Sequence, residues 1–544
     1  MIAASPLLTD RLRRAAETAA LRVLGDQDTD ASSPTYGCFD RRYWAWKIVD
    51  FPEATFQRHV YPLAMLVQDP ASRLYQRADV LDAVRAGLTF ALSVQHRNGS
   101  FDQAFPFEQS WGATAFLLQP LLAAFELLKP SLGADADRIA DRLSASARFL
   151  VRQREQHGTI ANHLAGGAHA LIEAGRVLSD GRSTAAGKAL VGEVIALQTD
   201  EGWFPEYGGA DPGYQTLCLY YLAEVAQAAP SPELTRALGR ALDFLQWFVH
   251  PDGTLGGVYG SRRTRVAYPG GLALLSKEFP VAAAAAQAVL TAAAEEKTVT
   301  VLTIDAANLA PLLTNIVRAL PVAPAPSAAQ LPRDRESASA DFPKAGLHVR
   351  ATPAYYAIVG SANGGTLTVF DRSTGARIKD DGGYVAQLED GRFITSQVTG
   401  AHAVTAAPSS IAVQTRFREM RREAPRPWQF LLLRVLNLTV MRSLVAGNAI
   451  KRAIVSRLIA AQAPVPLDVT RTFTFGDRIA IVDRFSNDGG LTLRWLRGGR
   501  PFQSVHMASA GYDGATFLAG PEGGVEIDAA QLTRSRAAEW SGRV

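Results

Sequence analysis

Residues 198–222 read QTDEGWFPEYGGADPGYQTLCLYYL and join a glycine-rich loop to the first turns of an apolar helix. A loop that only reverses the chain needs a few Gly, Pro, Asn or Asp residues and no aromatic ones. Here aromatic rings and carboxylates lie among the glycines. This composition is typical of a sugar-binding or catalytic loop at a helix N-terminus, although a connection whose rings only fill a core would share it.

The same kind of turn recurs along the first 325 residues. Its glycines lie at 99, 158, 202 and 253, and the four segments read NGSF (98–101), HGTI (157–160), EGWF (201–204) and DGTL (252–255). Intervals of 59, 44 and 51 residues fit two helices with their loops, so the repeating unit is predicted to be a helical hairpin. Such hairpins stack as an open solenoid or close into an α/α toroid. The recurrence of unusual loops at one position favours the toroid.

The stretches between these turns predict helices. In one of them Leu81, Val84, Leu88 and Leu92 recur at three and four positions, and alanine is abundant throughout. A first helix is expected to begin near Thr9 or Asp10. The other predicted helices span 80–95, 114–128, 136–153, 185–197, 217–228 and 234–249.

The pattern changes after residues 321–341, whose Pro, Ala and Ser content is that of a linker. Beyond them, apolar and polar residues alternate around turns at 360–365, 389–391 and 476–477, which predicts antiparallel strands. The predicted fold is multidomain, α then β. We expect a toroid at 1–325, a linker at 326–341 and a β-sandwich at 342–544.

One segment interrupts the predicted strands. Residues 426–462 carry six basic side chains and no acidic one, and arginines break their apolar runs. They predict one or two basic amphipathic helices inserted into the sandwich. Such helices dock on an anionic membrane surface, or they pack against the toroid or a protein partner. The sequence leaves these options open.

The overall composition is that of a folded protein with several domains. The chain has 544 residues, of which 47% are hydrophobic and 20% charged. A net charge of +4 and a pI near 9.0 modestly favour an anionic partner such as an acidic glycan, and we expect no nucleic acid. Cys38 and Cys218 cannot form a disulfide framework and are expected to be small buried residues.

The N-terminal residues lack the uninterrupted apolar core of a secretory signal. The sequence also has no run of eighteen uncharged apolar residues, so no membrane-spanning helix is expected. These features predict a cytoplasmic protein, peripheral to the inner membrane if the basic segment docks there.

Candidate site residues gather in the loops that follow the turns. Asn162 and His163 begin a helix, where the first could be an N-cap and the second a structural histidine. Gly166 and Gly167 in that helix predict close approach by another backbone or a ligand. His169 lies six residues from His163, a poor spacing for a shared metal, and we expect neither a metal nor a cofactor.

The other loops offer aromatic rings and amides for a saccharide, and arginines for a carboxylate. The candidate catalytic residues are Asn162, His163, Tyr207, Tyr214 and Arg262, and the candidate substrate-binding residues are Asp102, Glu108, Gln109, Trp111, Trp203, Glu206, Asp211, Gln215, Tyr259 and Arg263.

These residue types support proton abstraction next to a carboxylate. The carboxylate charge must be neutralised first, which Asn162 with Arg262 or Arg263 could do. Tyr207 or Tyr214, with a pKa lowered by the arginines, could serve as base and the other as acid, with His163 as the alternative base.

A toroid, a linker and a β-sandwich in this order resemble the toroid-type polysaccharide lyases, including the heparinase II/III and alginate lyase groups. The resemblance rests on the Asn162–His163 pair and on the loop with Tyr207 and Tyr214. It implies that an Asn, often with a His or Arg, neutralises a uronate carboxylate, that a Tyr or His removes the C5 proton, and that a Tyr protonates the leaving oxygen. The β domain offers only His348 where heparinase II/III-type proteins are His-rich, so zinc is not expected.

The leading expectation is an enzyme that acts on a uronate-containing polysaccharide or lipid-linked glycan, by β-elimination or C5 epimerisation. Both reactions begin with the same proton abstraction. Glu206 and Asp211 keep a glycoside hydrolase open, because paired carboxylates perform that reaction. A non-catalytic glycan- or membrane-binding scaffold is the third option. Terpene-cyclase-like barrels share turns such as 198–203, but the chain lacks a DxDD motif and carries a long β domain.

Overall fold

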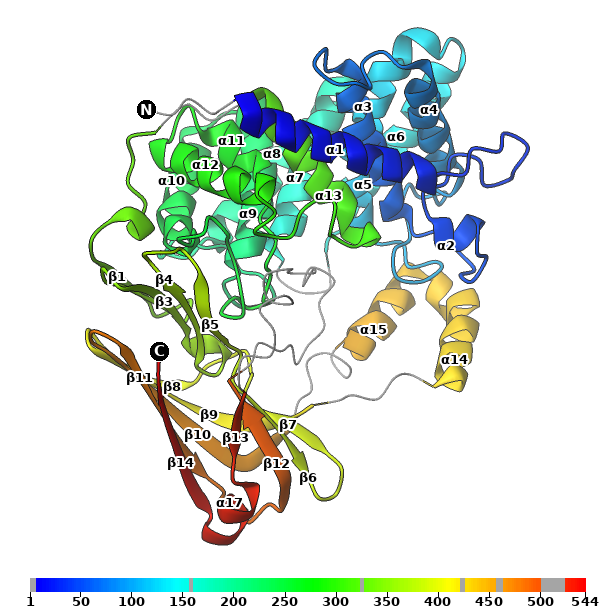
Figure 1. The fold of residues 1–544 in the computed structure, drawn as a ribbon. Helices are drawn as coiled ribbons and strands as arrows, with labels where there is room; N and C mark the ends of the chain where they lie inside the picture. Colours follow the sequence, from blue (N-terminus) through cyan, green and yellow to red (C-terminus); the bar gives the residue numbers. More distant parts are fainter. Residues whose placement is uncertain (1–5, 156–159, 323–326, 421–425, 456–462, 500–523) are drawn as a thin grey trace.

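The N-terminal part of the chain forms a closed ring of helices (Figure 1). The computed structural model describes residues 6–155, 160–322, 327–420, 426–455, 463–499 and 524–544. The inner helices contact one another in chain order, and the last packs back on the first. This closure confirms the predicted α/α toroid. The inner helices are α3 (Val60–Gln68), α5 (Trp111–Leu128), α7 (Ala161–Val177), α9 (Pro212–Ala228), α11 (Gly270–Leu275) and α13 (Ala306–Ala319).

A second layer of helices packs around this ring. The helices predicted from the sequence, in both layers, are all present, and each end lies within five residues of its predicted position. The short helix α2 (Arg41–Trp44) precedes the ring. The outer helices are α1 (Pro6–Asp26), α4 (Ala78–Ser93), α6 (Asp135–Arg152), α8 (Gly181–Leu197), α10 (Pro232–Leu245) and α12 (Pro280–Ala294).

The repeated glycines serve a common packing purpose. Gly99, Gly202 and Gly253 have φ of 92°, 95° and 85°, and each lies against an outer helix. A Cβ atom there would stand 2.2, 2.1 and 2.7 Å from a carbonyl oxygen of α6, α10 and α12, so only glycine fits. Gly37 does the same against α4, at φ 91° and 2.1 Å, and is a further repeat that the sequence reasoning missed. Most of the predicted turn at 157–160 lies outside the described residues.

A glutamine amide fastens three of these turns to the outer layer. Gln27, Gln95 and Gln198 each donate from Nε2 to the carbonyl of the turn glycine, at 3.3, 3.3 and 2.9 Å. The same nitrogens donate to carbonyls of α4, α6 and α10 at 2.8, 2.9 and 2.8 Å. The loops are therefore held at one end of the ring by side chains within the repeat itself.

The C-terminal part forms two antiparallel sheets, as predicted. The three predicted turns join β3 to β4, β6 to β7 and β10 to β11, and β1 begins inside the segment predicted as a linker. The first sheet has the order β1 (Ala338–Phe342), β2 (Leu347–Ala351), β3 (Tyr355–Gly360), β4 (Thr366–Asp371) and β5 (Arg377–Asp381). The second has the order β13 (Val525–Ile527), β12 (Leu493–Gly498), β6 (Tyr384–Leu388), β7 (Phe393–Thr395), β9 (Ser410–Met420), β10 (Pro464–Phe475), β11 (Ile479–Ser486) and β14 (Ala537–Arg543), with β8 (Ala403–Ala407) beside β9.

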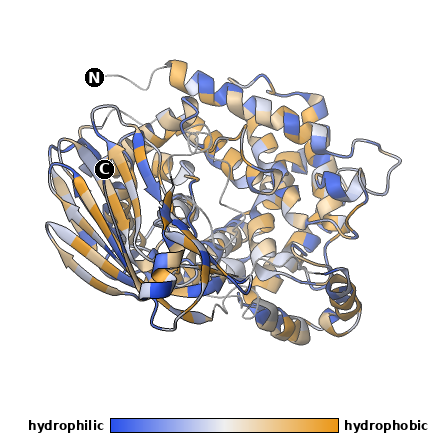
Figure 2. Cartoon of the chain, turned by 60° about the horizontal axis from the view of Figure 1, so that its bottom comes forward, coloured by the Kyte–Doolittle hydropathy of each residue, from blue (hydrophilic) through white to orange (hydrophobic). Residues whose placement is uncertain are grey.

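The first sheet is the middle layer between the toroid and the second sheet (Figure 1). One face packs Tyr356 and Phe370 against Phe248 and Tyr259 of the toroid, and the other packs against apolar residues of the second sheet. Alternation of hydrophobic and hydrophilic residues along the strands follows these contacts (Figure 2). Helix α17 (Ala529–Ser535) covers part of the second sheet.

The predicted basic insertion forms two helices between β9 and β10. They are α14 (Pro427–Leu438) and α15 (Leu444–Val455), joined by a short 3₁₀ turn, and they lie at the edge of the toroid (Figure 1). Residues 456–462 of the predicted segment lie outside the described part of the chain.

Two smaller expectations concern membrane spans and thiols. Among the described residues, Trp111–Ser131 is long and apolar enough to cross a membrane, yet 72% of its apolar 18-residue window is buried inside the molecule. It contains α5, an inner helix of the ring, whose apolar character this packing explains. Cys38 and Cys218 are free and buried, as predicted.

Candidate active site

Two loops meet above the N-terminal ends of α7 and α9. Glu206 forms isolated β-bridges with Ile160 and Gly209, and the backbone N–H of Ser261 donates to the carbonyl of Ala210 at 2.8 Å. The hydroxyl of Ser261 donates to the Glu206 carbonyl at 2.9 Å. The loops that follow the glycine turns at 202 and 253 are thus hydrogen-bonded to each other, and these contacts fix the positions of their side chains.

Glu206 lies at the centre of this arrangement and is buried. Asn162, in the first turn of α7, donates from Nδ2 to one carboxylate oxygen at 2.6 Å, and Arg262 donates from Nη1 to the other at 2.6 Å. The carboxylate therefore holds the amide and the guanidinium in fixed positions. Three of the residues that the sequence singled out are brought together here.

Both candidate tyrosines stack on the same guanidinium. The central carbon of Arg262 lies 4.6 Å from the ring centroid of Tyr207 and 4.1 Å from that of Tyr214. Tyr207 is 44% exposed and has a φ of 53°, a left-handed conformation that is uncommon for a tyrosine. The cation is thus shared between two phenol rings, one of which is open to solvent.

His163 follows Asn162 in the first turn of α7 and is positioned by groups that the sequence reasoning did not identify. Its Nδ1 is 2.8 Å from a carboxylate oxygen of the buried Glu155. The ring meets Phe116 edge to face at 5.0 Å, and Phe116 stacks on Tyr221 at 5.7 Å. Glu155 precedes the turn at 157–160 and belongs to no recognisable sequence motif. Only the fold therefore reveals the contact between Glu155 and His163.

Burial and charge act in opposite directions on these groups. Burial raises the pKa of Glu206, against the lowering effects of Arg262, His163 and Asn162. Burial alone would lower the pKa of Arg262, but Tyr214, Glu206 and Tyr207 outweigh it and the pKa is raised. The pKa of Tyr207 is raised by burial despite Arg262, which contradicts the expectation of a lowered value. Arg262 therefore stays positively charged.

Asp211 is placed differently from the prediction. It caps α9 by accepting from the N–H of Tyr214 at 2.9 Å, and it accepts from the N–H of Arg262 at 2.9 Å. It is buried, and burial raises its pKa. Its carboxylate is thus used within the fold, and that of Glu206 is occupied by Asn162 and Arg262. This geometry disfavours a glycosidase pair, which needs both carboxylates free to reach substrate.

Several other candidates hold the loops or the domain interface instead of facing a groove. Gln215 accepts from the N–H of Phe204 at 3.0 Å and donates to the Gly202 carbonyl at 3.2 Å. Tyr259 and Trp203 pack in the buried cluster between the toroid and the first sheet. Arg263 is buried, donates to the Gln397 carbonyl at 3.4 Å, and has its pKa lowered to about 10 by burial.

The candidates of the first loop lie beside the helical insertion. Asp102 accepts from the N–H groups of Phe107 and Gln109, at 2.8 and 2.9 Å. Glu108 pairs with Lys451, and the side chain of Gln109 donates to the Arg442 carbonyl at 3.1 Å. This loop is therefore an anchor for α15.

The indole of Trp111 donates to the Leu150 carbonyl at 3.3 Å. A Cβ at Gly167 would stand 2.4 Å from its ring, and one at Gly166 would stand 2.8 Å from Phe116. The two glycines therefore admit aromatic side chains, where the sequence predicted a backbone or a ligand.

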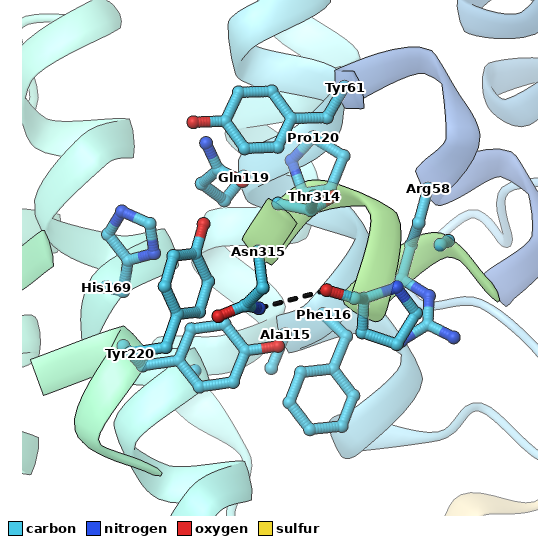
Figure 3. Close-up of a pocket in the computed structure, with 14 residues that line it drawn as sticks. Arg58, Tyr61, Ala115, Phe116, Gln119, Pro120, His169, Tyr220, Thr314 and Asn315 are labelled. Atoms are coloured by element: carbon cyan, nitrogen blue, oxygen red, sulfur yellow. Dashed lines mark hydrogen bonds between the residues drawn. The ribbon is translucent and has the colours of Figure 1, made fainter. Parts of the chain in front are cut away.

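A small pocket lies between the inner helices α5, α7, α9 and α13 (Figure 3). Its cavity volume is about 30 Å³, and Phe116, which lines it with Tyr221, also contacts the ring of His163. Within the described part of the chain, Nδ1 of His169 and the hydroxyl of Tyr220 are buried there without a hydrogen-bond partner. A pocket of this size has room for about one water molecule, and Asn162, Glu206 and Arg262 do not line it.

The comparisons with known proteins agree with this picture. Residues 54–301 match the sequence model of the Ulvan lyase N-terminal domain. No curated protein sequence matches the chain.

Two solved structures share the fold. The chondroitin AC lyase of Streptomyces coelicolor A3, solved with chondroitin sulphate, has a TM-score of 0.55 and 13% identity over 90% of this chain and 67% of its own. A Paenibacillus xanthan lyase has a TM-score of 0.52 and 12% identity over 91% of this chain. The chain spans 46% of the length of that xanthan lyase. Residues 54–301 thus resemble an ulvan lyase N-terminal domain, and the chain as a whole shares the fold of these two polysaccharide lyases.

Proposed function

We propose that the protein cleaves an acidic, uronate-containing polysaccharide by β-elimination at the Asn162–Glu206–Arg262 cluster. One observation carries this proposal. Asn162 and Arg262 each donate a buried hydrogen bond to the Glu206 carboxylate, which fixes a neutral amide and a cation side by side. The ulvan lyase domain and the acidic polysaccharide named with the chondroitin AC lyase support an acidic glycan as substrate.

Each residue has a distinct task in this reaction. Removal of the C5 proton places negative charge on the uronate carboxylate, and fixed donors lower the cost of that charge. Asn162 has one amide hydrogen beyond the one given to Glu206, and Nε of Arg262 has no partner within the described residues. These donors would bind the carboxylate.

Tyr214 is the proposed base, because its ring stacks closest to the Arg262 cation, which stabilises a phenolate. Tyr207, partly open to solvent, is the proposed acid for the leaving oxygen. His163, held by Glu155, would contact the neighbouring sugar.

The test is to add the protein to ulvan and to other uronate polymers and follow the ultraviolet absorbance of the new C=C bond. Tyr214→Phe and Asn162→Ala should each lower kcat by about 10²-fold or more. Tyr75→Phe, an exposed tyrosine far from the cluster in sequence, is the control and should keep full activity. Circular dichroism should show all three variants folded.

Other products would assign another reaction to the same cluster. Exchange of the C5 proton in deuterated water without chain cleavage would identify an epimerase. New reducing ends without unsaturation would identify a hydrolase and contradict the roles given to Asn162 and Tyr214. Full activity of Tyr214→Phe would remove this tyrosine as the base.

A further inference from the structure

Helix α14 presents an apolar stripe to solvent. Trp428, Leu431, Leu432, Val435 and Leu438 recur at three- and four-residue spacing, and their exposed fractions lie between 52% and 68%. In a globular protein a stripe with this spacing normally faces a core. In α14, however, Asn437 is the single buried residue. The stripe is therefore suited to contact with something outside the chain.

The apolar surface continues onto neighbouring segments. Val440 and Val445 of the insertion are more than half exposed, as are Trp46 and Ile48 of the loop after α2. Arg434 of α14 joins the two regions through its ion pair with Asp50 on that loop, at 2.8 Å. Exposed apolar patches that extend over several segments mark interaction sites on soluble proteins.

The same surface carries an excess of positive charge. Residues 426–455 contain five basic side chains and no acidic one. Arg434 and Lys451 are paired with acidic residues of the toroid, whereas Arg426, Arg442 and Arg452 extend from exposed positions. An anionic surface would complement this charge, because basic side chains next to a membrane are attracted to acidic headgroups.

The shape of the insertion favours a lipid surface over a protein groove. The two helices form a hairpin that stands out from the edge of the toroid (Figure 1). Amphipathic helices with Trp and Leu on one face and Arg or Lys around it lie in the boundary between headgroups and acyl chains. We propose that the α14–α15 hairpin docks the protein on a bilayer that contains anionic lipids.

The hairpin is fastened to the part of the toroid that carries the candidate site. Besides the Lys451–Glu108 pair, the guanidinium of Arg442 lies 4.6 Å from the ring centroid of Phe107. Leu444 and Asn448 of α15 line a pocket together with Glu155, the partner of His163. A docked hairpin would hold the site beside the lipid surface, where a lipid-linked acidic glycan is presented; this last step rests on the proposed function.

The experiment is flotation of the full chain with lipid vesicles. The protein should float with vesicles of phosphatidylcholine and phosphatidylglycerol, remain unbound with phosphatidylcholine alone, and detach as salt is raised. The variant Leu431→Ser/Leu432→Ser/Val435→Ser should lower the partition coefficient by about tenfold or more, because three leucine-sized side chains no longer enter the boundary. The matched control is Leu21→Ser/Leu302→Ser/Ile378→Ser, which changes exposed apolar residues elsewhere and should bind as the parent does.

Three results would overturn the proposal. They are no flotation with the acidic vesicles, equal flotation of the stripe variant and the control, and stripe-dependent self-association in sedimentation without lipid binding. The last result would make the hairpin a protein interface. Circular dichroism of both triple variants separates loss of binding from loss of folding, and flotation is independent of any turnover assay.

Discussion

The buried pair of Glu206 and Arg262 shows how one residue can set the geometry of a site. Removing two charges from water costs several kcal/mol each, and such pairs add little net stability. Both carboxylate oxygens of Glu206 nevertheless accept hydrogen bonds from the candidate residues Asn162 and Arg262. We infer that the pair is kept for position: it orients Asn162 toward substrate and keeps Arg262 charged between two phenol rings.

A buried histidine of the toroid makes stability depend on pH. His59 is 4% exposed, its Nδ1 lies 2.7 Å from the Phe56 carbonyl, and burial lowers its pKa to about 3. Above pH 6.5 the ring is neutral in both the folded and unfolded chain, so it has no pH effect. Between pH 6.5 and about 3 only the unfolded chain binds the proton, so stability falls by up to about 1.4 kcal/mol per pH unit.

The variant His59→Asn checks this. Its free energy of unfolding in urea at pH 7 should be lower than that of the parent. Between pH 6 and 4, the free energy of unfolding should change less steeply with pH in the variant. The difference should be up to about 1.4 kcal/mol per pH unit, which corresponds to one bound proton. Equal slopes in parent and variant would show that His59 is not the group responsible.

Single residues were the hardest part of the site to predict. Asn162, Tyr207, Tyr214 and Arg262 follow from the chemistry of their loops, and the structure brings them together. Asp211 was a candidate for substrate binding, and with Glu206 for hydrolysis, because a helix cap and a functional acid have the same sequence signal before a helix. Only the backbone N–H groups that it meets, from a loop fifty residues away, decide between the two.

At the scale of elements, the glycine turns decide how the helical hairpins nest. Gly202 combines a φ of 95° with a carbonyl oxygen 2.1 Å from the place of a Cβ atom. Gly202→Ala should therefore destabilise the toroid by about 2–4 kcal/mol, through backbone strain and overpacking. Chemical denaturation followed by circular dichroism measures the change.

Gly192 is the matched control for this substitution. It lies exposed within α8, where a Cβ atom would meet nothing within 4 Å. Gly192→Ala should stabilise the chain by about 0.5–1 kcal/mol, since alanine favours a helix interior. Similar effects at both positions would show that the turn geometry does not depend on glycine.

The elements themselves were largely predictable, because local patterns determine them. Apolar spacing of three and four predicted α4, α6, α8 and α10 of the outer layer and α5 and α9 of the inner ring. Alternation around glycine turns predicted the hairpins of the β domain. The repeat at Gly37 was missed because its segment, YGCF, differs in sequence from the others. What it shares with them is the contact of its glycine with an outer helix, which a sequence does not display.

For the whole molecule, the β domain supports the loop that carries Arg262 as well as covering the toroid. Asn363, in the turn between β3 and β4, donates from Nδ2 to the carbonyls of Val258 and Gly260 at 3.2 and 2.7 Å. Arg265 of the same loop pairs with Asp380 of β5 at 2.6 Å. Nothing in the composition of either domain predicts these contacts, because they join segments about a hundred residues apart.

This support leads to a prediction with an internal control. Asn363→Ala should lose about 2 kcal/mol of stability, as expected for buried carbonyls left without a donor. Asn487→Ala should lose a similar amount, since Asn487 is equally buried and also donates to two carbonyls, but within the β domain. Only Asn363→Ala should loosen the loop that carries Arg262.

Hydrogen exchange of the amides in residues 256–265 measures this directly. The Asn363 variant should exchange faster there than the parent, and the Asn487 variant should not. On an active substrate, kcat/KM should fall about tenfold or more for the first variant alone, because a displacement of about 1 Å in a catalytic group is that costly. Equal exchange in both variants would show that the toroid holds the Arg262 loop by itself, and that the β domain contributes stability without positioning the site.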